Sequence, residues 1–597
     1  MTETQRLVWC LSRPICAEVN DAMQQLTSVK YATSEQHKDL SKARQARDIA
    51  DTNKLVSILA ERNPFEESPS LQNIVTGVAT REDVNVELAE EVGQKILEDM
   101  TGNNVNQYVF RKRNQVITPE SKSTIKIDGE KVNIDPQLLF QRLVIAGTQA
   151  TNLLDAFQYE LCSYPPALFE TKHVLLKANK PALAKAIWDL IPQGDRLDKP
   201  SNCQYVLDGG ALLHRIPWQI GDTYKSILQS YTSYVKKRYG KAVIVFDGYT
   251  SGPSTKDGTH QRRLGTRQGR AVNFQTQMSL KIKKEEFLSN DENKQRFINL
   301  LGDSLEAAGC EVHHAKDDAD LLIVQTAIKV VSQRNVILVG DDTDLLVLLC
   351  YHTKNVKYNL FWRPEPKKGK KEKLLNIGRV CQKLGEDLCN SILFVHAFLG
   401  CDTTSRVFGY GKGVALKLAQ DSEYFRDLAK VFGNCDSSED EIIQAGEKAM
   451  LCVYKAKPDD NLDSLRHHRF QELVATSKKV IHPKSLPPTS GAVKYHSFRV
   501  FHQVQAWKGN RLNAENWGWK IIEEKMFPLM TDLDVAPKSL LEVVRCKCKT
   551  GCGKRCGCRR LGLDCTPACS ECRGICENMN LENTEETSDD DRDILGM

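Results

Sequence analysis

Three short runs of β-forming residues, each followed by a turn or an acidic residue, constrain the fold of this chain more than any other feature. The runs are QYVLD at 204–208, AVIVFD at 242–247 and NVILVG at 335–340. Segments with helical periodicity, Thr223 to Tyr239 and Asp320 to Val331, separate them. Strands that alternate with helices predict a mostly parallel sheet covered by helices on both faces. We therefore expect an α/β fold in the middle of the chain.

The chain of 597 residues is too long for a single hydrophobic core, so we expect several domains. The residue composition changes at four points along the sequence, which predicts five regions. They are a mainly helical region at 1–199, the α/β domain at 200–420, a helical extension and linker at 421–539, a cysteine-rich module at 540–580, and an acidic disordered tail at 581–597.

Two patterns in the first region predict local structure. Ser41 to Glu61 is strongly charged, with apolar residues at helical intervals, and predicts a helix. Residues 123–134 alternate around Asp128 and Gly129, which indicates a hairpin with a two-residue turn. No catalytic arrangement of residues is evident in this region, so its function stays open.

Composition excludes some partners and leaves others open. No run of about twenty apolar residues occurs, so we expect no membrane span. The first 23 residues carry Glu3, Arg6 and Arg13 within their apolar stretch, which is unlike a secretory signal. A net charge of +5 on so long a chain is weak evidence for any partner.

Acidic residues collect where the β-rich runs end. They are Asp208, Asp247, the cluster at 317–320, the cluster at 341–344, and Asp402. Any one of them could be a turn residue or a helix cap. In a parallel sheet, however, the carboxyl ends of the strands meet at one edge, where ligands bind. Converging carboxylates repel one another and are normally held by hard cations such as Mg²⁺ or Mn²⁺.

The order of these motifs resembles the flap-endonuclease family, whose nuclease domain is PIN-like. The matching residues are VLD at 206–208, VFDG at 245–248, DAD at 318–320, DTD at 342–344 and FLGCD at 398–402. The family has Glu-Ala-Glu at the third motif, so each acid there is one methylene shorter in this chain. The resemblance covers a little over a third of the sequence.

The resemblance implies a site for two divalent ions, Mg²⁺ or Mn²⁺, which can activate a water and stabilise the leaving oxygen of a phosphodiester. One ion would be held by Asp208, Asp247, Asp318 and Asp320. The other would be held by Asp342, Asp344 and Asp402, with Asp320 shared between them. These seven residues are the expected catalytic residues.

The same resemblance points to residues that contact nucleic acid. Backbone N–H groups of the GYGKG segment would grip a duplex phosphate, and a basic stretch between Asp247 and Asp318 would steer single strands. The expected residues are Gly409, Gly411, Lys412 and Gly413 in the first group, and Lys256, Arg262 and Arg263 in the second. An ordinary turn between helices and a solvated charged face remain alternatives.

Nine cysteines fall within 31 residues. They are Cys546, Cys548, Cys552, Cys556, Cys558, Cys565, Cys569, Cys572 and Cys576. So small a segment cannot bury enough apolar surface to fold alone, and bound metal would supply the missing stability. Because tetrahedral zinc takes four ligands, nine cysteines predict several zinc ions that share bridging thiolates. Disulfides would require an oxidising compartment and would leave one cysteine over.

The cysteine spacing resembles the CXC domain of tesmin and TSO1-like proteins, which implies three zinc ions and contact with DNA. Arg555 stands where that family usually has a tyrosine that enters the minor groove. The interleaved lysines and arginines favour phosphate contact. The whole arrangement also resembles multidomain animal proteins whose function is not established.

The leading hypothesis is a metal-dependent nuclease tethered to nucleic acid by a zinc module, with DNA favoured over RNA. Two alternatives stay open: a protein that binds nucleic acid without cutting it, and an interaction scaffold in which zinc is only structural. The two modules and the lysine-rich run at 367–373 suggest a nuclear location, although that run could equally be a solvated loop.

Overall fold

The structure is a computed structural model. It describes residues 19, 22–24, 42–61, 94, 97–98, 101–102, 124–127, 130–133, 139–145, 153–191, 202–248, 252–257, 269–354, 356–364, 374–457, 460–476, 481–522, 525–537, 540–541, 546, 548, 552, 556–560, 565 and 569. The helix and the hairpin predicted in the first region are both present. They are α2 (Lys42–Glu61) and the antiparallel pair β1 (Thr124–Ile127) and β2 (Glu130–Asn133).

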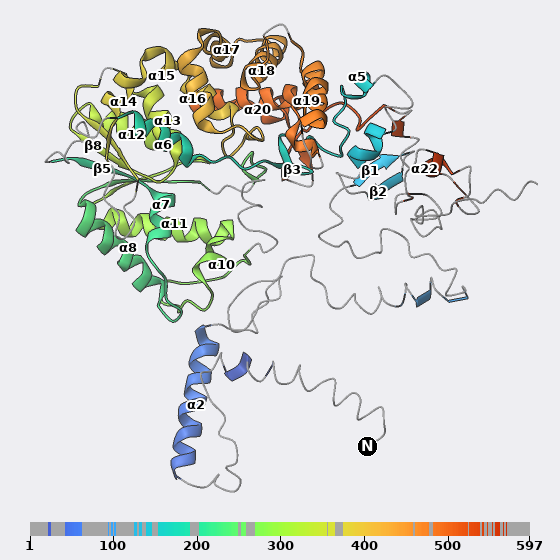
Figure 1. Cartoon of the computed structure of the whole chain (residues 1–597). Helices are drawn as coiled ribbons and strands as arrows, with labels where there is room; N and C mark the ends of the chain where they lie inside the picture. Colours follow the sequence, from blue (N-terminus) through green and yellow to red (C-terminus); the bar gives the residue numbers. More distant parts are fainter. Residues whose placement is uncertain are drawn as a thin grey trace, which may run out of the picture.

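A six-stranded sheet lies between two layers of helices (Figure 1). Its order is β10 (Leu375–Asn376), β9 (Leu360–Arg363), β8 (Val336–Val339), β5 (Gln204–Asp208), β6 (Val243–Phe246) and β7 (Glu311–His314). The pairs from β9 to β7 are parallel, and only β10 is antiparallel to its neighbour in this sheet. The predicted α/β class with a mostly parallel sheet is confirmed.

Helices cover both faces of this sheet. One face packs against α8 (Tyr224–Tyr239) and α11 (Asp291–Ala307), and the other against α12 (Asp320–Val331), α13 (Thr343–His352) and α15 (Glu386–Phe398). Within β8, Val336 and Leu338 join one hydrophobic cluster, whereas Ile337 and Val339 join the other. A strand buried on both faces needs apolar residues at every position, which explains its unbroken VILV sequence.

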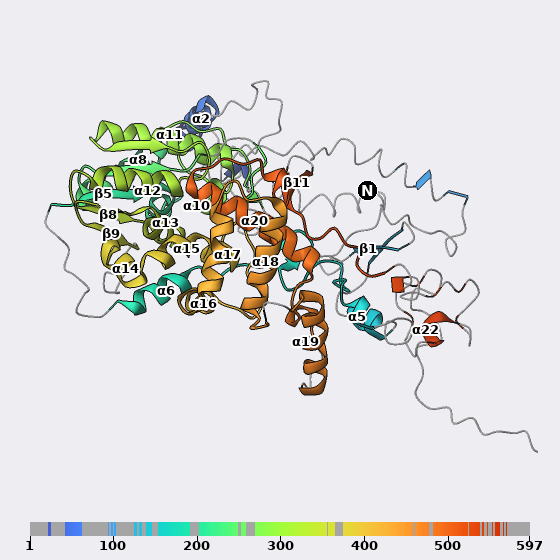
Figure 2. The same cartoon turned by 90° about the horizontal axis from the view of Figure 1, so that it is seen from above.

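The larger hydrophobic cluster extends beyond residues 200–420. Leu183 of α6 (Pro181–Leu190) belongs to it, as do Phe432 of α17 (Glu423–Gly433) and Val493 of α20 (Ser490–Lys508). Figure 2 shows α17, α18 (Glu439–Val453) and α20 grouped beside α15. The α/β sheet, α6 and the helical extension therefore share one core.

The remaining described elements belong to this core or to smaller neighbouring clusters. They are α5 (Leu153–Ala156), β3 (Phe169–Thr171), β4 (Val174–Leu175), α7 (Gly209–Arg215), α10 (Lys284–Leu288), α14 (Ile377–Leu384), α16 (Lys412–Asp421), α19 (Leu462–Thr476), η3 (Pro483–Ser485), η4 (Ala514–Asn516), β11 (Trp519–Ile522), β12 (Lys525–Pro528) and α22 (Gly557–Arg560). In the described part of the chain, no helix combines the length and apolar character needed to cross a membrane.

Close packing of α18 on α20 generates a prediction about stability. A methyl group on Gly446 of α18 would lie 2.7 Å from Cβ of Ser497 in α20, so Gly446→Ala forces the two helices apart. We expect this variant to lower the free energy of unfolding by about 1–3 kcal/mol. Urea denaturation measures the change.

Gly433 is the matched control, because a methyl group there would meet no atom within 4 Å. Gly433→Ala should change the free energy of unfolding by less than about 1 kcal/mol. Equal denaturation midpoints for the two variants would contradict the packing argument.

Candidate functional site: a carboxylate cavity and a cysteine cluster

Acidic residues from four neighbouring strands meet at the carboxyl edge of the sheet. Asp208 ends β5, Asp247 follows β6, Asp320 begins α12 after β7, and Asp342 follows β8. These four residues, with Asp318 and Asp402, line one cavity of about 1050 Å³. The seventh predicted acid, Asp344, is buried, but its carboxylate lies within 4.8 Å of those of Asp320 and Asp342. The structure thus brings all seven predicted acids together.

Local backbone geometry fixes the direction of several of these side chains. Asp208 caps α7, and its Oδ1 accepts a hydrogen bond from the Ala211 amide at 3.1 Å. Asp342 caps α13 in the same way, accepting from the Asp344 amide at 3.0 Å. Capping and site-building are therefore performed by the same residues, because a strand that ends at a helix start presents its cap at the sheet edge.

Burial and mutual repulsion disfavour the charged form of three of these acids, Asp208, Asp320 and Asp342. Burial and the neighbouring Asp247 raise the pKa of Asp208 to about 7. Burial and Asp318 raise the pKa of Asp320 well above its ordinary value, and burial and Asp344 raise that of Asp342. Carboxylates that repel one another in a cavity are stabilised by divalent cations. The all-oxygen ligand set of Asp320, Asp342 and Asp344 fits such an ion.

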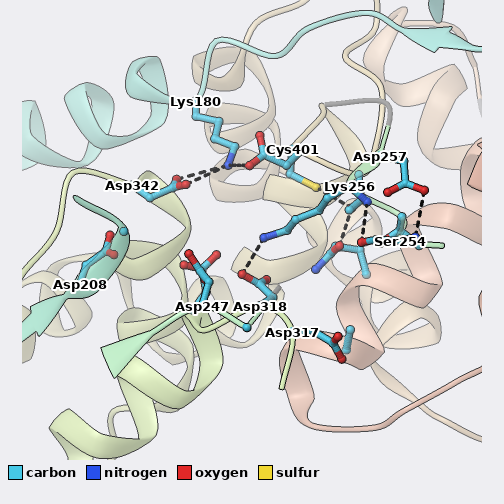
Figure 3. Close-up of a pocket in the computed structure, with 18 of the residues that line it drawn as sticks. Lys180, Asp208, Asp247, Ser254, Lys256, Asp257, Asp317, Asp318, Asp342 and Cys401 are labelled. Carbon is cyan, nitrogen blue, oxygen red and sulfur yellow. Dashed lines mark hydrogen bonds and ion pairs between the residues drawn. The ribbon is translucent and has the colours of Figure 1, made fainter. Parts of the chain in front are cut away.

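Two lysines provide positive charge inside the acidic cavity (Figure 3). Lys256, on the loop after β6, places its Nζ 2.6 Å from Asp318. Lys180, at the start of α6, lies at 3.2 Å from Asp342, 2.9 Å from Asp344 and 3.0 Å from Asp402. The sequence pointed to Lys256 but not to Lys180, because a single lysine far upstream of the motifs carries no periodic or motif signal.

The loop that carries Lys256 is fastened to the helical extension. Asp257 Oδ2 accepts hydrogen bonds from the backbone N–H of Ser254 and of Met526 in β12, both at 3.0 Å. Residues of α20, including Gln503, also line the cavity. The extension therefore forms part of the site, which its sequence did not reveal. Arg262 and Arg263, predicted to act with Lys256, lie outside the described residues.

A buried chain of polar groups supports Asp344 from behind. His396 of α15 donates from Nε2 to Asp344 Oδ1 at 2.7 Å, and its ring stacks on Trp507. Its Nδ1 accepts from Lys412 Nζ at 3.0 Å, and burial lowers the pKa of His396 well below its ordinary value. A neutral histidine with this tautomer orients the carboxylate in the way that second-sphere histidines orient metal ligands.

The GYGKG segment divides between surface and interior. Gly409, Gly411 and Gly413 are exposed, and Gly409 has φ +83°, a conformation that favours glycine. Lys412 is only 2% exposed, and burial lowers its pKa to about 7. The Lys412 side chain therefore turns inward toward His396. The phosphate contact predicted for this segment rests on backbone N–H groups and stays a prediction.

Seven of the nine clustered cysteines are described, and they lie close together. Two groups of four could each hold a metal ion: one joins Cys546, Cys548, Cys552 and Cys556, and the other joins Cys546, Cys556, Cys558 and Cys565. Cys546 and Cys556 belong to both groups, as bridging ligands would. Sulfur separations of 3.6–3.8 Å among Cys546, Cys552, Cys556, Cys558, Cys565 and Cys569 exceed a disulfide bond.

A residue of the first region reaches this cluster. Arg142 donates from a guanidinium nitrogen to Cys558 Sγ at 2.9 Å in a buried contact. The hydrogen bond with Cys569 and burial raise the pKa of the Cys558 thiol. The positive charge of Arg142 acts in the opposite direction and favours the thiolate, the form that binds zinc. Cys572 and Cys576 lie outside the described residues.

Comparisons with known proteins give limited matches. Residues 1–160 match a family model described as a domain of unknown function (DUF8702), and no curated protein matches the chain. Among solved structures, the chain is similar to the catalytic core of Rad2 in complex with a DNA substrate. That match has 14% identity and a TM-score of 0.26, and it covers 51% of this chain and 88% of that chain.

Two further solved structures are similar at the same level. One is a bacteriophage T5 D15 flap endonuclease complex with DNA and metal ions, with 13% identity, a TM-score of 0.26, and coverage of 52% of this chain and 97% of that one. The other is the eukaryotic junction-resolving enzyme GEN-1 binding caesium, with 15% identity, a TM-score of 0.24, and coverage of 55% and 64%.

The raised pKa of Asp208 predicts how stability depends on pH. The folded pKa of Asp208 is about 7, above the ordinary 3.8, so the folded protein keeps a proton that the unfolded chain releases. The free energy of unfolding therefore falls as the pH rises from about 4 to 7. In buffer without divalent ions other than protein-bound zinc, Asp208→Asn should unfold at a higher temperature than wild type at pH 8, by about 2–4 °C. The difference should shrink at pH 5.

Thermal unfolding followed by circular dichroism at both pH values checks this expectation. Asp341→Asn is the control, because its side chain is half exposed and removal of its charge should leave the pH dependence unchanged. If the unfolding temperatures of wild type and Asp208→Asn change equally with pH, burial of Asp208 does not destabilise the fold at high pH.

The shared cysteines predict an asymmetry in zinc content. Cys546→Ser removes a ligand from both groups of four, whereas Cys548→Ser removes a ligand from one. The first variant should lose two zinc ions per chain and the second no more than one, measured by plasma mass spectrometry on the full-length protein. Equal losses would mean that Cys546 does not bridge.

Proposed function

We propose that this protein is a divalent-metal-dependent nuclease that hydrolyses phosphodiesters of a structured or single-stranded nucleic acid, with the cysteine module as a zinc-binding tether. The observation that carries the proposal is the convergence of seven acids from separate elements around one cavity. Isolated turn or cap residues have no reason to share a cavity. The ordered motif set and this geometry are independent arguments for the same site.

The ions that the acids would hold supply an activated water and stabilise the leaving oxygen of the substrate. Asp208, Asp247, Asp318 and Asp320 would form one ligand group, and Asp342, Asp344 and Asp402 the other. His396 holds Asp344 in a fixed orientation, so that ligand needs little reorganisation. The protein's own contribution is thus the spacing and direction of the carboxylates.

Nucleic acid would reach the acids through a cavity whose rim carries positive charge. Exposed Lys177 and half-buried Arg215 and Lys294 line the same cavity as the acids. Lysines and arginines at the mouth of a cavity attract phosphates and raise the local concentration of nucleic acid. The exposed glycines Gly409, Gly411 and Gly413 lie just before and within the first turn of α16. Because the N-terminus of a helix attracts anions, this segment is our proposed duplex-phosphate contact.

A second candidate function is binding of nucleic acid without cleavage. The observation that favours it is the pairing of Lys180 and Lys256 with the acids, because lysine ammonium groups can neutralise carboxylates without a metal ion. DNA is our preferred substrate over RNA under either function. The two functions are separated by whether metal-dependent cleavage occurs.

Cleavage assays with a matched pair of variants test the proposal. Asp342→Asn removes a carboxylate of the ligand set, whereas Asp341→Asn removes an adjacent, half-exposed carboxylate that pairs with Arg215. With Mg²⁺ or Mn²⁺ and labelled flap, bubble, single-stranded and duplex DNA and RNA, Asp342→Asn should lower the cleavage rate at least ~100-fold. Asp341→Asn should stay within about threefold.

Binding measured by fluorescence anisotropy completes the test. Asp342→Asn should retain binding, because lysines and arginines contact the phosphates. Binding by wild type and both variants without any cleavage would favour the second candidate function. Cleavage that survives in Asp342→Asn would place the active site elsewhere.

A further inference from the structure

Lys180 makes the densest set of ion pairs with the acidic cavity among the described residues. Its Nζ lies 2.9–3.2 Å from carboxylate oxygens of Asp342, Asp344 and Asp402. Figure 3 shows the ammonium directed at Asp342 from α6, a helix that precedes the first strand of the sheet in sequence. These three carboxylates form the second proposed ligand group, so Lys180 stands at the centre of that group.

The position of Lys180 is fixed by packing rather than by chance contact. Pro181 begins α6 with its constrained backbone, and Leu183 and Ile187 are fully buried in the larger hydrophobic cluster. The side chain of Lys180 is only 13% exposed. A surface ion pair holds its partners weakly, whereas an anchored, nearly buried lysine remains near its carboxylates.

An ammonium and a divalent ion compete for the same oxygens in this group. Carboxylate oxygens bind Mg²⁺ at about 2.0–2.1 Å, which requires the ion to sit between the three carboxylates. The Nζ of Lys180 already lies within hydrogen-bond distance of all three. Both cations cannot occupy that space, since they would lie within a few ångströms of each other and repel.

We propose that Lys180 is a built-in competing cation: it occupies the ligand group of Asp342, Asp344 and Asp402 in the metal-free protein and must leave before a divalent ion binds there. This inference rests on the proposed function, because it takes the acids to be metal ligands. Lys256 contacts only Asp318 among the ion pairs of the described residues, so competition is stronger at the group that Lys180 faces. The Asp342 group is therefore the weaker of the two ion sites.

The competition also sets the conditions under which the enzyme can act. A site that fills only after an ammonium is displaced stays incomplete at low divalent-ion concentration. The full chain would then bind one ion tightly and a second only when the ion is abundant. This dependence on ion concentration comes from Lys180 at the start of α6, which precedes all the acidic motifs in the sequence.

Manganese binding to the full-length, zinc-loaded protein tests the proposal. Free Mn²⁺ is measured by electron paramagnetic resonance at constant pH, without nucleic acid, for wild type and Lys180→Met. We expect wild type to bind two ions with unequal affinity and Lys180→Met to bind the weaker ion about tenfold more tightly. Lys180→Arg, which keeps the charge, should bind it as weakly as wild type.

Lys177→Met is the matched control, because Lys177 is an exposed lysine on the rim of the same cavity three residues away. It should leave the Mn²⁺ isotherm within about twofold of wild type, since exposed charges at longer range are screened. An equal effect of Lys177→Met and Lys180→Met would mean that only general charge matters, and it would overturn the proposal.

Other outcomes separate this proposal from the proposed function. A wild-type isotherm with two ions that Lys180→Met leaves unchanged would overturn the competition and leave the nuclease intact. Competition observed in a protein that cuts no substrate would overturn the nuclease and leave the competing lysine. If Lys180→Met does not fold by circular dichroism, Lys180→Gln provides the same comparison, with the same expected tightening.

Discussion

Repulsion among carboxylates at one edge of the sheet is the interaction on which the rest of the structure depends. Parallel strands end side by side at one edge of the sheet, so the acids at their ends lie close together even though their charges repel one another. Burial adds to the repulsion and raises the pKa of Asp208, Asp320 and Asp342. The fold offsets this with groups from other elements: Lys180, Lys256 and the His396 behind Asp344.

The parts of the chain outside the sheet are therefore structural components of the cavity. The helical extension contributes Gln503 to its wall and, through the amide of Met526, holds the loop of Lys256. The segment before the sheet contributes Lys180 by burying one face of α6. Without the segment before the sheet, the acids would lack Lys180. Without the helical extension, the loop of Lys256 would lose the hydrogen bond from Met526 that holds it.

Much of the sheet and all seven acids could be predicted from the sequence, because unbroken apolar runs ending in aspartate are local signals. The strand β7 could not, since its Glu-Val-His-His sequence has no such run. Lys180 and His396 were missed because long-range pairs leave no pattern along the chain. The inward direction of the Lys412 side chain was not predicted either, because a motif gives the position of a residue, whereas burial decides the direction of its side chain.

The fastening of Asp257 to Met526 has a consequence for how the protein is made. The acidic cavity draws on side chains and amides from Lys180 to Met526, which spans more than half of the chain. During synthesis from the N-terminus, the ribosome delivers every acid before it delivers the hairpin that secures the Lys256 loop. The cavity of a growing chain therefore stays incomplete until β12 has been translated. A chain truncated before that point would contain the acids but not the hairpin that secures the Lys256 loop.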